Sequence, residues 1–120
     1  MEGNWKSFVS DLVRKPAVPT EADHVRGVGA AGKYDATVGS EAEARGIVQQ
    51  ALPHAVELPP AFTGQPYPNP PKGVKAWFQV QPAESDVGNM LPHIKYADWT
   101  RGKKASGGSW GHLFFPPLQQ

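Results

Sequence analysis

This chain of 120 residues contains no cysteine and no strong excess of charge of either sign. The absence of cysteine excludes a disulfide framework and thiolate chemistry. No apolar run is long enough to span a membrane, and the start, Met-Glu-Gly-Asn-Trp-Lys-Ser-Phe, lacks the basic region and continuous apolar core of a signal peptide. The four histidines lie far apart without a metal-ligand spacing, so the sequence predicts neither a metal site nor a cofactor.

Proline and glycine, in contrast, are abundant. There are 13 of each, about twice the usual share. Together with 39% hydrophobic residues, this composition predicts one compact domain of short elements and long ordered loops rather than a helical bundle.

The net charge of +1 is unevenly distributed along the chain. Residues 1–60 hold six Lys/Arg and eight Asp/Glu, which gives a net charge of −2. Residues 61–120 hold six Lys/Arg and three Asp/Glu, which gives a net charge of +3. A local basic patch on a nearly neutral protein suits a local anionic ligand better than duplex DNA.

The N-terminal quarter is expected to hold an amphipathic helix over residues 4–14, because apolar residues recur there at helical spacing. Prolines make residues 15–23 a connector. We therefore expect an N-terminal segment, residues 1–25, followed by an α+β domain, residues 26–120.

Residues 24–39 are rich in glycine, and three of them form a Gly-x-Gly-x-x-Gly pattern. No hydrophobic strand precedes it and no helix follows at once, so it does not predict a dinucleotide site. We expect a loop, on which Lys33 and Tyr34 are candidates to face a substrate.

The clearest helix is expected over residues 41–52. Ser40 and Glu43 have the spacing of a capping box, and Pro53 ends the pattern. The predicted buried face consists of Ala44, Ile47, Val48, Ala51 and Leu52.

Strands are expected in the second half of the chain. Residues 55–58 form a short candidate, the proline-rich stretch 64–73 is an ordered loop, and residues 74–81 alternate clearly. Residues 93–99 and 109–115 should pair as an antiparallel hairpin through the basic loop 101–108. The predicted fold is α+β, with a small antiparallel sheet of three to four strands and one or two helices packed on one face.

This hairpin carries the candidate chemistry. Side chains alternate along a strand, so His93, Lys95 and Trp99 share one face of the first strand, and Trp110 and His112 share one face of the second. Two histidines and nearby cations are the groups that a metal-free ribonuclease needs for proton transfer and charge stabilisation. The candidate catalytic residues are His112, His93 and Lys95, and the candidate substrate-binding residues are Arg101, Lys103, Lys33, Tyr34, Trp99 and Trp110.

The ending Gly-Gly-Ser-Trp-Gly-His-Leu-Phe-Phe-Pro-Pro, with the glycine-rich lead-in and the capped helix, resembles the C-terminal domains of bacterial polymorphic toxins. The resemblance covers roughly residues 26–116 and is to the barnase/EndoU/colicin/RelE-like ribonucleases. It implies transesterification of RNA, with tRNA as one candidate, leaving a 2′,3′-cyclic phosphate without a metal. His112 and His93 would then be the acid and base, and Lys95 and Arg101 would hold the phosphate.

The same resemblance implies an RNA substrate, a cognate immunity protein and delivery into the cytoplasm of a target cell. A chain that is not a secreted toxin is expected to be cytoplasmic. The oligomeric state is left open.

Two other functions are compatible with the sequence. The proline-rich loop with Tyr67, beside exposed aromatic residues, suits a peptide-binding or assembly module of a phage or secretion system. An ADP-ribosyltransferase toxin would use His93, Tyr96 and either Glu84 or Asp98.

Overall fold

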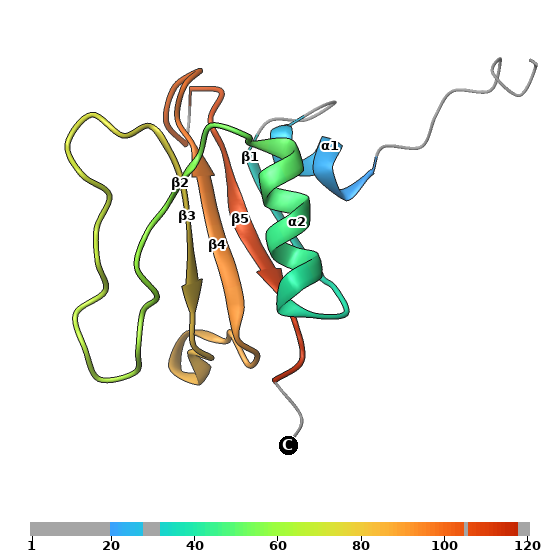
Figure 1. Cartoon of the computed structure of the whole chain (residues 1–120), viewed down its shortest axis with the longest axis vertical. Coiled ribbons are helices and arrows are strands. Elements are labelled where there is room, and N and C mark those ends of the chain that lie inside the picture. The colour runs from blue at the N-terminus through green and yellow to red at the C-terminus, as the bar shows by residue number, and fades with distance from the viewer. Residues whose placement is uncertain (1–19, 28–31, 105, 118–120) are drawn as a thin grey trace, which may run out of the picture.

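The computed structural model describes residues 20–27, 32–104 and 106–117 (Figure 1). The amphipathic helix expected over residues 4–14 lies outside these residues. The elements run in the order α1 (Glu21–Arg26), β1 (Gly32–Thr37), α2 (Glu41–Ala51), β2 (Val56–Glu57), β3 (Ala76–Gln81), a short 3-10 helix η2 (Ser85–Val87), β4 (His93–Asp98) and β5 (Ser109–Phe114).

The strands form one five-stranded sheet in the order β1-β5-β4-β3-β2. The expected hairpin of β4 and β5 is confirmed, and β3 is antiparallel to β4. The two outer strands are parallel to their neighbours, β1 to β5 and β2 to β3. The α+β class is therefore correct, but the sheet is mixed and has five strands instead of an antiparallel three or four.

The glycine-rich segment differs from its prediction for a physical reason. β1 lies within it, and its residues Gly-Lys-Tyr-Asp-Ala-Thr are half-buried and exposed in alternation rather than strongly apolar. A parallel partner lies far away in the sequence, because parallel strands need a crossover connection. The pairing of β1 with the last strand is therefore not visible from the local pattern.

The expected connector over residues 15–23 overlaps a helix. Thr20 and Asp23 form a reciprocal capping box at the start of α1, and Gly27 ends the helix in the left-handed conformation, with φ of 82°. Ala22 and Val25 are buried in the core. Residues 20–26 thus contribute to the folded unit.

Helix α2 confirms its prediction closely. The Ser40 hydroxyl accepts a hydrogen bond from the Glu43 N–H at 3.0 Å, while the Glu43 carboxylate accepts from Gly39 N–H instead of completing the expected box at Ser40. Of the predicted apolar face, Ile47 is only half-buried. The remaining four residues are buried, namely Ala44, Val48, Ala51 and Leu52.

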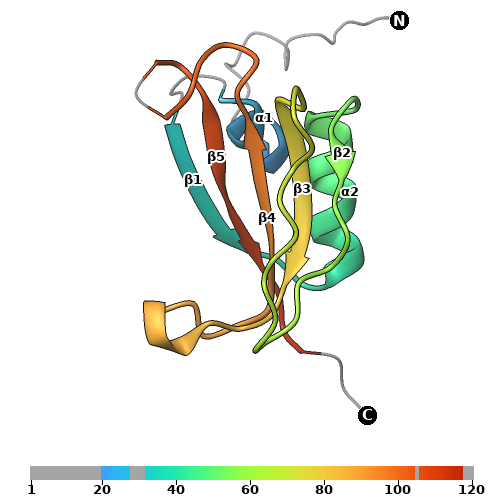
Figure 2. The ribbon, with the colours of Figure 1, turned by 90° about the vertical axis from the view of Figure 1, so that its left-hand side faces the viewer.

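Both helices cover the same face of the sheet, as Figure 2 shows from the opposite side. The core lies between them and includes Phe78, Ile94, Tyr96 and Leu113. Because side chains alternate along each strand, the neighbouring positions point to the other side. We call that side the helix-free face. The loop of residues 58–75 runs along its β3 edge.

Candidate active site on the helix-free face

The strand register arranges the side chains of the helix-free face in three rows across β1, β5, β4 and β3. Residues that pair across strands lie side by side, and rows are two residues apart, about 6.7 Å. The upper row is Lys33, Trp110, Ala97 and Trp77; the central row is Asp35, His112, Lys95 and Gln79; the lower row is Thr37, Phe114, His93 and Gln81.

The central row contains an aspartate–histidine pair. One carboxylate oxygen of Asp35, Oδ1, accepts from the His112 backbone N–H at 2.9 Å and lies 3.1 Å from the ring nitrogen Nδ1. This contact holds a proton on Nδ1 and leaves Nε2 as the nitrogen with the free lone pair. The contact with Asp35 therefore fixes both the tautomer and the orientation of the His112 ring.

Asp35 was absent from the residues predicted as a site. The sequence placed it two positions after Lys33, which indicates the same face of a strand. Only the parallel pairing of β1 with β5 brings it to His112, and that pairing has no local signal in the sequence.

Two lysines flank the pair. Lys95 lies directly opposite His112, and Lys33 Nζ lies 3.5 Å from the second oxygen of Asp35. Burial is the main cause that lowers the pKa of Lys95, and the nearby Lys104 lowers it further, while Glu84 raises it. Lys95 is thus a cation that releases a proton more readily than an exposed lysine.

His93, the second predicted acid–base residue, belongs to a hydrogen-bonded chain that runs to the proline-rich loop. The carbonyl oxygens of Pro59 and Pro68 both accept from the Gln79 amide at 3.0 Å. This fixes the amide, so its oxygen accepts from Gln81 at 2.8 Å. The Gln81 oxygen then faces His93 Nε2 at 3.1 Å.

The other contacts of His93 complete its enclosure. Nδ1 lies 3.1 Å from the Leu91 carbonyl, Glu84 Oε1 lies 3.2 Å from Nε2, and the side chain is fully buried. Burial is the largest influence and lowers the pKa of His93, as does His112, whereas the Leu91 carbonyl and Glu84 raise it. Both ring nitrogens are occupied by the protein. His93 supports the His112 ring, at 5.1 Å between centroids, and has no nitrogen free for a substrate.

Two predicted substrate-binding residues lie elsewhere. Tyr34 is on the helix side of β1, where its ring stacks on His24 at 4.6 Å and its hydroxyl donates to Glu21. Burial, with Glu21, raises the pKa of Tyr34 to about 12. Arg101 donates to the Arg26 carbonyl at 2.5 Å and to Ser109 Oγ at 3.3 Å, so it braces α1 against β5.

The geometry also separates the residues of the ADP-ribosyltransferase alternative. His93 and Tyr96 differ by three positions on β4 and point to opposite faces of the sheet. Tyr96 is fully buried in the core, and its hydroxyl donates to the Tyr34 carbonyl at 2.8 Å.

The remaining predicted residues lie around the upper row. Lys33 and Lys104 approach the ring of Trp110, at 5.4 and 4.4 Å from its centroid, within the range of cation–π contacts. Trp99 and Lys103 line a pocket next to this row. Three of the four strands of the face thus present indole or ammonium groups there.

Among the residues that the structure describes, no three His, Asp or Glu side chains gather as a metal site. No helix in this part of the chain is long and apolar enough to cross a membrane. The chain matches no protein-family model, and neither a curated protein nor a solved structure shows significant similarity to it.

Proposed function

We propose that this domain binds single-stranded RNA on its helix-free face and cleaves it by transesterification, with His112 as the acid–base group. The observation that carries the proposal is the central row, in which Asp35 orients His112 and Lys95 lies opposite it. A base with a fixed tautomer beside a cation is suited to phosphodiester cleavage through the 2′-hydroxyl, since it provides proton transfer and charge stabilisation.

The steps follow from this row. His112 Nε2 removes the proton of a 2′-hydroxyl, and the 2′-oxygen attacks the adjacent phosphorus. The bond from phosphorus to the 5′-oxygen breaks, leaving a 2′,3′-cyclic phosphate and a 5′-hydroxyl. Asp35 stabilises the imidazolium that forms. Lys95 offsets the charge of the phosphorane and gives a proton to the departing oxygen, consistent with the lowered pKa of its ammonium group.

The test compares His112→Ala with His54→Ala on total RNA and tRNA in EDTA. Loss of an acid–base group costs roughly 10²- to 10⁴-fold in rate. His54 is an exposed histidine in the segment after α2 and belongs to none of the three rows of the helix-free face, so its variant controls for the loss of an imidazole. Equal rates for the two variants, with both folded, would overturn the assignment.

The resemblance to polymorphic toxins extends this proposal to a toxin that acts in the cytoplasm of a target cell and is neutralised by a cognate immunity protein. The helix-free face carries the cationic side chains of Lys33, Lys95 and Lys104, which are complementary in charge to an acidic inhibitor. Intracellular expression of the wild type should arrest growth, and His112→Ala should not. Growth arrest of equal strength by both would refute the toxin proposal as stated.

A peptide-binding module is the second candidate, and one observation favours it. A pocket beside the upper row is lined by Trp77 and Trp99 together with Pro70 and Pro71. Aromatic grooves of this kind bind extended peptides. Binding of proline-rich peptides without RNA cleavage would favour this candidate.

A further inference from the structure

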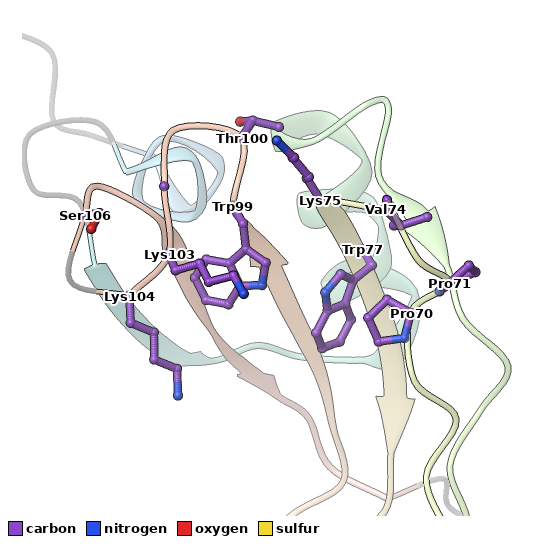
Figure 3. Close-up of a pocket in the computed structure, with 12 residues that line it drawn as sticks. Pro70, Pro71, Val74, Lys75, Trp77, Trp99, Thr100, Lys103, Lys104 and Ser106 are labelled. Atoms are coloured by element: carbon purple, nitrogen blue, oxygen red, sulfur yellow. The ribbon is translucent and has the colours of Figure 1, made fainter.

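The pocket beside the upper row has room for a nucleotide. Its volume is about 910 Å³, and it lies between the loop of residues 70–75 and the loop that joins β4 to β5. Ligand pockets of small molecules fall in the range of roughly 300–1,000 Å³. Figure 3 shows Trp99 over the end of β4 and Trp77 over β3, with their indoles at the same cavity.

The walls of this pocket have two kinds of chemistry. One part is aromatic and apolar, from Trp77, Trp99 and Pro70, and the other is a cationic rim of Lys75, Lys103 and Lys104. None of the described residues that line it is acidic. A flat aromatic group and a negative charge are the ligand features that such a combination recognises.

The backbone holds the Trp99 indole in its place. A Cβ at Gly108 would lie 2.5 Å from Cε3 and 2.8 Å from Cζ3 of this ring, and 2.4 Å from the Gly102 carbonyl oxygen. Only glycine at position 108 therefore allows the loop to pack directly against the indole. The wall is built by close packing rather than by a freely exposed side chain.

The pocket adjoins the central row. Trp77 pairs with Ala97, two positions from Lys95 along the sheet, which is about 6.7 Å. Trp99 directly follows the end of β4. Both indoles are on the face that carries His112. A chain bound at the central row by a phosphate would extend into this pocket with its neighbouring unit.

We propose that this pocket is a subsite for one unpaired nucleobase, stacked on Trp77 and Trp99, with its phosphate held by Lys103 and Lys104. This inference rests on the proposed ribonuclease function, since it places the base next to the cleaved bond. The recognised substrate is single-stranded RNA, because a base that is paired and stacked in a duplex has no face free to stack on an indole. Stacking accepts every base, so the subsite gives affinity with little sequence preference.

The experiment measures binding without cleavage. A fluorescently labelled 2′-O-methyl hexanucleotide has no free 2′-hydroxyl, so anisotropy reports its affinity for wild-type protein and for Trp77→Ala and Trp99→Ala. Each variant should weaken binding about 5- to 150-fold, the range for one stacked base. Phe62→Ala is the matched control, because Phe62 is a 64% exposed aromatic residue outside the pocket, and it should bind as the wild type does.

A change in the oligonucleotide tests the same contact without a change in the protein. One abasic position, moved along the hexanucleotide, should weaken wild-type binding most at a single place. With that position abasic, Trp77→Ala should cause no further loss. Lys103→Ala should reduce the salt dependence of binding. Lys72→Ala should not, because Lys72 is an exposed lysine of the adjoining loop that does not line the pocket.

The outcomes separate this proposal from the proposed function. If RNA is cut but neither tryptophan variant changes oligonucleotide affinity, the subsite is wrong. If the tryptophan variants and the abasic site weaken binding but RNA is not cut, the subsite stands and the cleavage proposal fails. If proline-rich peptide binds the pocket and the oligonucleotide does not compete, the subsite is wrong and the peptide-binding module is favoured.

Discussion

Replacing Asp35 by asparagine removes a negative charge beside His112 and keeps an oxygen in the same position. In the wild type, Oδ1 of Asp35 lies 3.1 Å from Nδ1 and 2.9 Å from the backbone nitrogen of His112. The amide oxygen of asparagine can accept both contacts. The variant therefore tests the charge of Asp35 with little change in geometry.

The structure sets the size of the effect. Two unit charges at about 4 Å attract by about 1 kcal/mol in water and about 4 kcal/mol at the effective dielectric of a protein surface. The Asp35 side chain is 34% exposed and that of His112 is 13% exposed, so about 1 to 3 kcal/mol of imidazolium stabilisation is expected to be lost. This corresponds to a rate reduction of about 5- to 150-fold.

The assay is single-turnover cleavage of a labelled oligoribonucleotide in EDTA. Asp86→Asn serves as the matched control, because Asp86 is an exposed carboxylate in η2, and its variant should keep the wild-type rate. A folded Asp35→Asn protein that cleaves as fast as the wild type would refute the role of the aspartate–histidine pair.

Three further predictions concern stability. Val48→Asp places an unpaired carboxylate at a fully buried position and should cost several kcal/mol, which circular dichroism would show as loss of the folded state; a wild-type melting temperature would contradict it. Burial lowers the pKa of His93 in the folded state, so the unfolded state binds more protons below about pH 6.5. The free energy of unfolding should therefore decrease as the pH is lowered below this value, by up to about 1.4 kcal/mol per pH unit. His93→Gln should flatten that slope in urea titrations, and an unchanged slope would be evidence against it. Gly111→Ala places a Cβ 1.9 Å from the Tyr34 carbonyl oxygen, so it should separate β1 from β5 and lower the denaturant midpoint. Gly46 is in an open helical position, so Gly46→Ala should stabilise the protein by about 0.5–1 kcal/mol. Denaturant midpoints in the reverse order would refute this prediction.

The parts of the fold that the sequence predicted are those encoded by local patterns. The helix after Ser40 has an N-terminal cap, apolar residues at helical spacing and a terminating proline. It begins and ends where these three signals predict. The pairing of β4 with β5 also follows from alternation on both sides of one loop. In each case the residues that decide the structure are close together in the sequence.

The parts that were wrong or missed depend on distant contacts. The alternation in β1 is weak, because Tyr34 and Ala36 are its only apolar residues, and its edge position requires only one paired side. Its pairing with β5 places Asp35 next to His112. Because side chains alternate along the strand, Tyr34 points to the opposite face of the sheet. The burial of His93 also could not be predicted from the sequence. No residue pattern near His93 indicates that Gln81, Leu91 and Glu84 contact its ring nitrogens.

The most direct test of the central claim is the chemistry of the ends that the wild-type protein leaves on RNA in EDTA. Attack by the 2′-hydroxyl predicts fragments with a 2′,3′-cyclic phosphate and a 5′-hydroxyl, no cleavage of the 2′-O-methyl analogue, and neither product with His112→Ala. Fragments that carry a 5′-phosphate and a 3′-hydroxyl, or RNA that stays intact from pH 5 to pH 8, would contradict the account.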